Sequence, residues 1–106
     1  YDLVSVAQYP ALDHAFAMAY GDEFHADRVT PFDWALFAQH TNTARSLLAR
    51  EMRRIGSAAA AAASLQPGDP VYSDAEKNFL EGIVAHVTAK ARKLIDMATP
   101  MLGVDL

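Results

Sequence analysis

The sequence predicts an all-α protein: a helical bundle built on a long antiparallel hairpin of helices over residues 31–64 and 74–99, with a short N-terminal helix over residues 10–20. Three observations lead to this fold class. Apolar residues recur at helical spacing in each segment. Capping residues precede both long segments, and a loop rich in proline and glycine separates them. The 106 residues, 52% apolar and 21% charged, suffice for one domain, which we expect to span residues 1–106.

The short N-terminal helix is predicted from the residues that follow Pro10, since proline is favourable in the first turn of a helix. The apolar residues that follow at helical spacing are Leu12, Phe16, Ala19 and Tyr20. Gly21 is then suited to the position just after the helix. Residues 1–9 either extend this helix or lie as an extended arm, and residues 22–30 are expected to form a polar connection.

The long helix over residues 31–64 has a well-defined start. Thr30 offers a hydroxyl N-cap, Pro31 suits the first helical position, and Asp33 places a negative charge in the first turn. No further proline interrupts this stretch, and residues 58–63 are consecutive alanines, the strongest helix former. At 1.5 Å per residue, a continuous helix of this length would extend roughly 50 Å.

The loop over residues 65–73 is expected to reverse the chain, because the two prolines and the glycine of its LQPGDP sequence cannot continue a helix. Ser73 and Glu76 then have the spacing of a capping box, and apolar periodicity follows directly. The second long helix is therefore predicted over residues 74–99, and Pro100 is expected to end it.

Both long helices contain a stretch of similar sequence, 47 positions apart. Six of nine aligned pairs are identical, and the other three exchange one large apolar residue for another. We expect the two stretches to present similar packing faces, which either shared amphipathicity or internal duplication explains. The pairs are Phe32/Phe79, Leu36/Ile83, Phe37/Val84, Ala38/Ala85, Thr41/Thr88, Ala44/Ala91, Arg45/Arg92, Leu47/Leu94 and Leu48/Ile95.

Two polar side chains interrupt the apolar face of the first long helix. At 100° per residue, His40 falls near the centre of this face, and Glu51 lies on the same arc about three turns later. We expect His40 to be buried or at an interface. A carboxylate that faces a core needs a partner or takes up a proton, so Glu51 requires a partner from another element. Both are candidate binding residues.

The charge is unevenly distributed in a chain whose net charge is −4. Six acids precede residue 34, whereas the middle of the chain carries a basic patch of Arg45, Arg50, Arg53 and Arg54. The four arginines lack interleaved aromatic residues and any nucleic-acid-reading motif, so nucleic-acid binding is not expected. We favour an internal match, in which the acidic N-terminal third folds over this helix or faces it across a dimer.

Most catalytic and cofactor-binding classes lack their residues in this sequence. Without cysteine there is no disulfide framework, thiolate zinc site or cysteine nucleophile, and glycine-rich phosphate loops and nucleophilic triads are absent. A ferritin-like di-metal site needs Glu-x-x-His pairs, which do not occur. The acids of residues 22–27 are expected to be solvated rather than to hold a metal ion. We expect no metal and no cofactor, and we favour a protein that is not an enzyme.

One enzyme-like alternative is histidine phosphotransfer, which needs an exposed imidazole in the middle of a helix and a nearby cation. His86 has Lys90 one turn away, although this spacing is one residue longer than is usual in phosphotransfer domains. A related alternative is a ligand-binding bundle that uses His86 and Lys90, or His40.

The expected function is a helical interaction or scaffold module. A hairpin of two amphipathic helices leaves apolar surface uncovered, and a helix over residues 10–20 is too short to close its whole length. We therefore expect a homodimer, or docking of a helical protein partner, through these apolar faces. No apolar run approaches the roughly 20 residues that span a bilayer, so we expect no membrane partner and a soluble protein, with the cytoplasm favoured over secretion.

Overall fold

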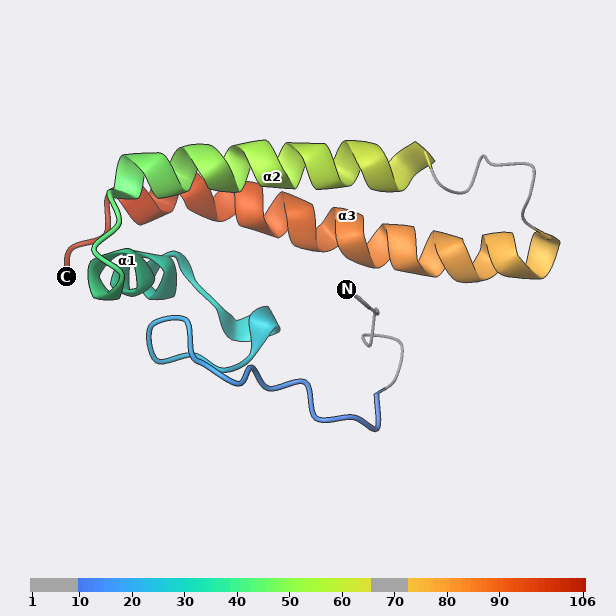
Figure 1. Cartoon of the computed structure of the whole chain (residues 1–106), viewed down its shortest axis with the longest axis horizontal. Coiled ribbons are helices and arrows are strands. Elements are labelled where there is room, and N and C mark those ends of the chain that lie inside the picture. Colours follow the sequence, from blue (N-terminus) through green and yellow to red (C-terminus); the bar gives the residue numbers. More distant parts are fainter. Residues whose placement is uncertain (1–9, 66–72) are drawn as a thin grey trace.

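The computed structural model describes residues 10–65 and 73–106 of the chain. A short 3-10 turn, Ala26–Arg28, precedes three helices, which are α1 (Pro31–His40), α2 (Arg45–Leu65) and α3 (Asp74–Leu102). Helices α2 and α3 lie side by side as a long antiparallel hairpin, and α1 packs against the base of this hairpin (Figure 1). The predicted all-α fold class is confirmed. Residues 1–9, expected either to extend the first helix or to lie as an arm, are outside the described residues, as is most of the expected loop over residues 65–73.

Helix α1 begins where the sequence predicts, because Thr30 and Asp33 cap each other. Thr30 Oγ1 accepts the Asp33 backbone N–H at 3.4 Å, and Asp33 Oδ2 accepts the Thr30 backbone N–H at 2.8 Å. Pro31 occupies the first turn, where its missing N–H costs nothing. The short N-terminal helix of the bundle is therefore Pro31–His40.

The prediction of one continuous helix over residues 31–64 is wrong, because the chain turns at residues 41–44. Asn42 has a φ of 54°, in the left-handed region that asparagine tolerates better than most residues. Thr41 Oγ1 donates to the Phe37 carbonyl at 2.8 Å, and the Thr43 N–H donates to the Ala38 carbonyl at 2.8 Å. These bonds close α1, so that α2 starts in a new direction at Arg45.

The predicted helix over residues 10–20 is also wrong, since this stretch contains no helix. Its backbone donors bond elsewhere: the Phe16 N–H donates to the Phe24 carbonyl at 2.6 Å, and Tyr20 and Glu23 exchange backbone bonds of 2.9 and 3.0 Å. Gly21, with a φ of 59°, makes the turn between them. A stretch this short is a marginal helix without tertiary packing, and these pairings replace the helical ones.

The hairpin core is built largely from small residues and methionine, with Ala49, Met52 and Gly56 buried on α2 and Ala91, Ala98 and Met101 buried on α3. Gly56 has no room for a side chain, because a Cβ there would lie 3.0 Å from the Ala91 carbonyl oxygen. Small residues at facing positions let the two helix backbones approach closely. The hairpin is therefore held by close backbone contact more than by large interlocking side chains.

Helix α3 starts at the predicted capping box and ends later than predicted. Ser73 Oγ accepts the Glu76 backbone N–H at 3.3 Å, and the Glu76 carboxylate accepts the Ser73 backbone N–H at 3.4 Å. The predicted end at residue 99 is wrong, because the helix continues through Pro100 to Leu102. A proline this near the end removes only one backbone donor from the last turn.

The two similar stretches do not present similar packing faces, contrary to the sequence-based expectation. The first stretch is divided between α1 and α2, whereas the second lies within the single helix α3. Ala44 is exposed while its counterpart Ala91 is buried, and Arg45 is half-buried while its counterpart Arg92 is exposed. The repeat in sequence therefore does not produce a repeat in structure.

Candidate functional site

The main candidate site is an open groove between the two long helices, with a volume of about 280 Å³. Its walls are apolar at the centre, and two basic side chains lie on its α3 side. The residues that line this open groove are Ile55, Gly56 and Ala59 of α2 and His86, Val87, Lys90, Ala91 and Leu94 of α3. Such a groove suits an apolar or amphipathic occupant with a few polar contacts at its edge.

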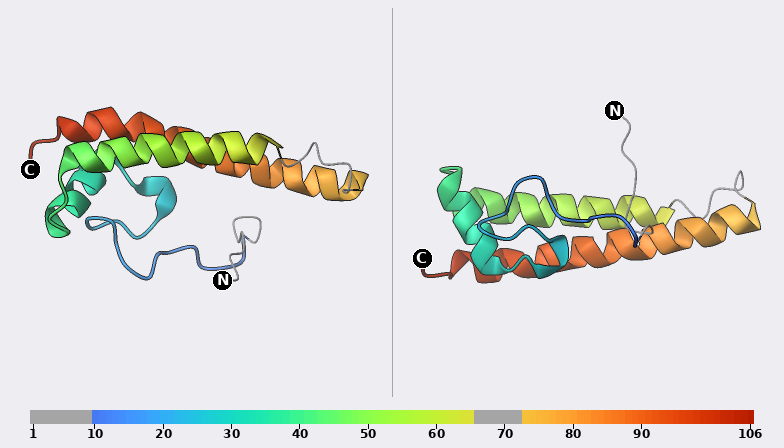
Figure 2. Two further views of the ribbon diagram at one scale, coloured as in Figure 1. Left: turned by 45° about the horizontal axis from the view of Figure 1, so that its top comes forward. Right: turned by 90° about the horizontal axis from the view of Figure 1, so that it is seen from below.

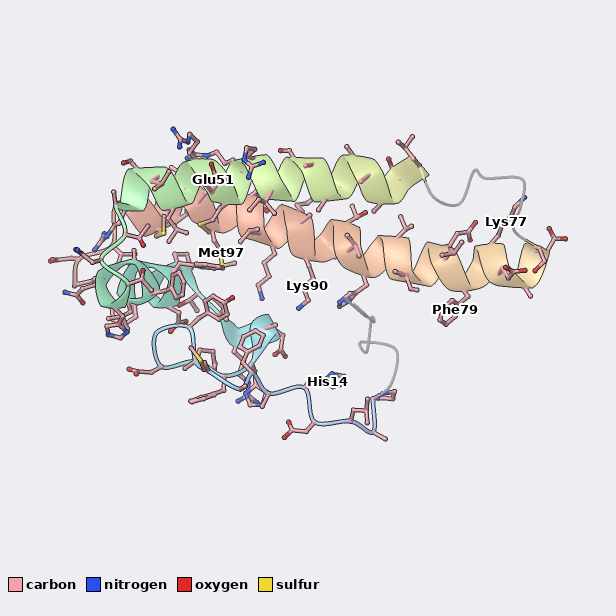
Figure 3. All side chains as sticks on the ribbon, viewed as in Figure 1. His14, Glu51, Lys77, Phe79, Lys90 and Met97 are labelled. Carbon is pink, nitrogen blue, oxygen red and sulfur yellow. The ribbon has the colours of Figure 1, made fainter. Side chains whose placement is uncertain are left out.

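Large apolar side chains are exposed on both long helices, one of them in the open groove and two nearer the outer end of the hairpin. Ile55 is 51% exposed, Phe79 is 55% exposed and Leu65 is 75% exposed. Phe79 projects from the outer part of α3 on the same side as Lys90 (Figure 3). Single exposed apolar residues are normal on a protein surface, so the apolar lining of the open groove, which includes Ile55, is the stronger indication of an interaction site.

Helix α1 lies at the base of the hairpin and does not extend along its length (Figure 2). There Trp34 and Leu48 pack against the buried cluster that contains Ala35 and Met101. With 10 residues, α1 extends about 15 Å, whereas the 21 residues of α2 extend about 32 Å. The third helix therefore completes the bundle at one end, and the open groove lies further along the hairpin.

His86 and Lys90 are brought together by the structure, since both line the open groove. The His86 side chain is exposed in the middle of α3, and Lys90 is half-buried one turn later. An exposed imidazole beside an ammonium group can bind an anion, because both groups donate hydrogen bonds when the imidazole is protonated. These two residues form the polar part of the candidate site.

His40 is not buried, so of the two positions expected from the sequence only that at an interface is left. It is exposed in the last turn of α1, where a histidine is compatible with the helix dipole. The expectation assumed that α1 and α2 share one helical face. The turn at Asn42 separates the two helices, so His40 does not lie on the apolar face of α2.

Glu51 does have a partner, but the expectation that this partner comes from another element is wrong. Its carboxylate lies 2.6 Å from Arg54 Nη2 and 3.8 Å from Arg50 Nε, both on α2. The hydrogen bond from Arg54 is the main cause that holds the pKa of Glu51 below its usual value. Glu51 is half-exposed and remains charged, so it forms a surface ion pair rather than a buried site.

The four arginines of the predicted basic patch act in three different ways. Arg50 and Arg54 flank Glu51, and the Arg53 guanidinium donates to Thr99 Oγ1 at 2.6 Å. Arg45 Nη1 donates to the carbonyls of Met101 and Val104, at 3.2 and 2.6 Å, and so caps the C-terminal end of α3. The patch is therefore not a single cationic surface.

The described part of the acidic N-terminal third lies on the α3 side of the hairpin rather than over these arginines (Figure 1). Its contact with α3 includes a hydrogen bond from Lys93 Nζ to the Asp27 carbonyl at 2.8 Å. The form of the expected charge match in which the N-terminal third folds over the arginines of its own chain is therefore not found in residues 10–33. Within the same described ranges, Glu23 and His25 approach to 3.9 Å, but no group of three His, Asp or Glu side chains could hold a metal ion.

The sequence-based interpretation missed an aromatic cluster at the base of the hairpin. Tyr20 lies 4.9 Å from Trp34 and 5.1 Å from Phe37 between ring centroids, and Phe16 lies 5.3 Å from Tyr20. These rings join the N-terminal segment to α1. The density of aromatic residues between positions 16 and 37 was the available signal, although the spacing alone did not indicate which rings would meet.

Comparisons with known proteins do not assign a function: no protein-family model, curated protein or solved structure matches this chain. Within the described ranges, none of the helices combines the length and apolar character needed to cross a membrane. The geometry of the open groove and of the exposed residues around it is therefore the basis for inferring function.

Proposed function

We propose that this protein is a helical interaction module that self-associates, with the open grooves of two copies facing each other in a bundle. The observation that carries the proposal is the apolar surface along the hairpin beyond α1, where Ile55, Phe79 and Leu65 are half or more exposed. Burying such side chains contributes about 25 cal/mol per Å² of apolar surface. A second hairpin brings apolar surface of the same shape and length.

A second copy is favoured over an unrelated helix because the surface is suited to pairing with itself. In a two-fold arrangement the same patch lies on both sides of the interface, so each exposed apolar residue contributes buried surface from both copies. The alanines of residues 58–63 include several that are exposed on α2, and small side chains allow a second helix to approach closely. A helical protein partner remains the alternative occupant, and the same experiment distinguishes the two.

The test is the substitution Ile55→Glu, which places a charge in the lining of the open groove. Ser57→Glu is the matched control, because Ser57 is exposed on the same helix and does not line the groove. We expect Ile55→Glu to weaken the dimer by about 2 kcal/mol or more, since a desolvated unpaired charge is costly. Sedimentation velocity at several concentrations measures this loss, and circular dichroism checks that the helices are retained.

The proposal fails if Ile55→Glu and Ser57→Glu leave the association equally strong. A wild-type chain that stays monomeric, yet captures an added amphipathic helix in a manner that Ile55→Glu abolishes, would instead identify the groove as a docking site for a helical partner. These results separate self-association from partner docking, because only the first depends on the concentration of this chain alone.

A second candidate function is histidine phosphotransfer at His86. It is supported by the position of this imidazole, which is exposed in the middle of α3 and shares the open groove with Lys90. Incubation with acetyl phosphate should then produce acid-labile phosphate that His86→Gln removes and His40→Gln retains. If both variants are labelled equally, or the wild type is not labelled, this candidate function is excluded.

A further inference from the structure

A second cavity, of about 190 Å³, lies between α3, α1 and the N-terminal segment of residues 10–30. We call it the N-terminal cavity. The residues that line it are Phe16, Tyr20, Ala26, Val29, Trp34, Lys90, Lys93, Leu94 and Met97. Lys90 extends from α3 toward the N-terminal segment (Figure 3). Lys90 and Leu94 also line the open groove, so the two hollows are neighbours along α3.

The walls of the N-terminal cavity are well defined despite the lack of helix in residues 10–25. Val29 is buried, and the ring of Tyr20 contacts that of Phe16 edge-on and that of Trp34 at a tilt. The Lys93–Asp27 hydrogen bond ties the 3-10 turn to α3. Aromatic side chains favour a further ring in an offset or edge-on arrangement, so these walls suit an aromatic ligand.

One cationic side chain in this wall, that of Lys90, lacks an acceptor among the described residues. Lys90 forms no hydrogen bond or ion pair within residues 10–65 and 73–106, and it is half-buried. The Trp34 indole Nε1 is buried without an acceptor in the same part of the chain. The ammonium group of Lys90 is therefore available to an anion in the cavity, whereas Trp34 Nε1 is shielded from solvent and does not face it.

We propose that the N-terminal cavity binds a small aromatic carboxylate, with the ring among the aromatic side chains and the carboxylate beside Lys90. The volume matches a ligand of one ring, because an apolar cavity of about 150 Å³ is large enough for benzene. The ammonium group of Lys90 favours an anion over a neutral ring of the same size. This inference does not depend on self-association, because residues of the described chain alone line the cavity.

The test uses the intact chain and two probes of nearly equal size, benzoate and the uncharged benzyl alcohol. Trp34 is the only tryptophan of the sequence, and it lines the N-terminal cavity but not the open groove. A change in its fluorescence therefore reports a ligand in the N-terminal cavity rather than in the open groove. We expect benzoate to change this fluorescence in a saturable way, and benzyl alcohol to bind more weakly.

Lys90→Met keeps an unbranched side chain close to the length of the lysine stem and removes the ammonium group with its charge. We expect it to weaken benzoate binding about tenfold, the effect of one hydrogen bond to a charged group at a half-exposed site, with little change for benzyl alcohol. Lys77→Met is the matched control, because Lys77 lies on α3 outside the cavity. This variant should bind benzoate as tightly as the wild type. Equal losses for benzoate and benzyl alcohol in Lys90→Met would contradict the role of its charge.

Ala26→Phe should fill the N-terminal cavity and abolish binding of both probes while the helices, measured by circular dichroism, are retained. If that variant loses its fold, Ala26→Leu provides the same test with a smaller side chain. Absence of a saturable fluorescence change in the wild type, or unchanged benzoate binding in a folded cavity-filling variant, would overturn the proposal.

Discussion

Gly56 of α2 lies directly against Ile95 of α3, so that a Cβ on Gly56 would be 2.7 Å from Ile95 Cγ1. The nearest backbone atom, the carbonyl oxygen of Ala91, would be at 3.0 Å. A side chain can rotate away from such a contact, but the backbone of a helix cannot. The absence of a side chain at position 56 therefore determines how closely the two long helices pack.

Gly56→Ala should destabilise the protein by about 1–3 kcal/mol, the usual cost of forcing extra volume into a packed contact. The sign of this stability change is informative, because helix propensity alone would make alanine more stable than glycine at this position. Gly82→Ala is the matched control: no atom lies within 4 Å of its added Cβ, so it should stabilise by about 0.5–1 kcal/mol. Urea unfolding of both variants measures the two changes, and a gain in stability for Gly56→Ala would refute the close approach of the helices.

Arg45→Met should loosen the C-terminal end of α3. The guanidinium of Arg45 donates to the carbonyls of Met101 and Val104, and losing hydrogen bonds to a charged group costs about 1–3 kcal/mol. The control is Arg50→Met, because the Arg50 side chain is 71% exposed. This substitution should change the free energy of unfolding by no more than about 0.5 kcal/mol. Chemical denaturation compares the two, and equal effects would show that Arg45 does not act as a cap.

Asn42→Ala should cost about 1 kcal/mol, because alanine is strained at the positive φ of this turn. Asn42→Gly should be neutral or stabilising, since glycine adopts this conformation freely. Thermal unfolding followed by circular dichroism distinguishes them. If Asn42→Ala were the more stable variant, residues 41–44 would have to be helical, and α1 and α2 would form one helix.

Glu51 should make a contribution to stability that depends on pH. Its pKa is lowered in the folded state, chiefly by the hydrogen bond from Arg54, so the contribution is present above the ordinary glutamate pKa of about 4.3. It is lost as the pH falls through the lowered folded-state pKa. The difference in unfolding free energy between wild type and Glu51→Gln should therefore shrink below about pH 4. Glu81→Gln, at an exposed site of α3, is the control. An unfolding free-energy difference between wild type and Glu51→Gln that grows as the pH falls would contradict this prediction.

The helix starts of this fold are predictable from the sequence because they depend on local interactions. Thr30 with Asp33, and Ser73 with Glu76, form the capping boxes that their spacing indicates. The turn at Asn42 was not predicted, since it contains neither proline nor glycine. Its threonines and asparagine do have low helix propensity and compete for backbone bonds, which is a weaker signal than the capping boxes.

The candidate site was only partly predictable, because it depends on contacts between elements. His86 and Lys90 lie on one helix, so their proximity followed from the helical repeat. The expected position of His40 depended on a continuous helix that does not exist. Arg54, the partner of Glu51, lies one turn away on the same helix, so the helical repeat indicated it, although a partner on another element was expected. The N-terminal cavity depends on non-local contacts of Phe16, Tyr20 and Trp34, which a sequence pattern does not specify.

The most direct test of the proposed function is the mass of the wild-type chain in solution, measured by size-exclusion chromatography with light scattering over a range of concentrations. Self-association through the open groove predicts twice the mass of the chain at micromolar concentrations, with dissociation on dilution. A single species with the mass of one chain, up to high micromolar concentration, would contradict it.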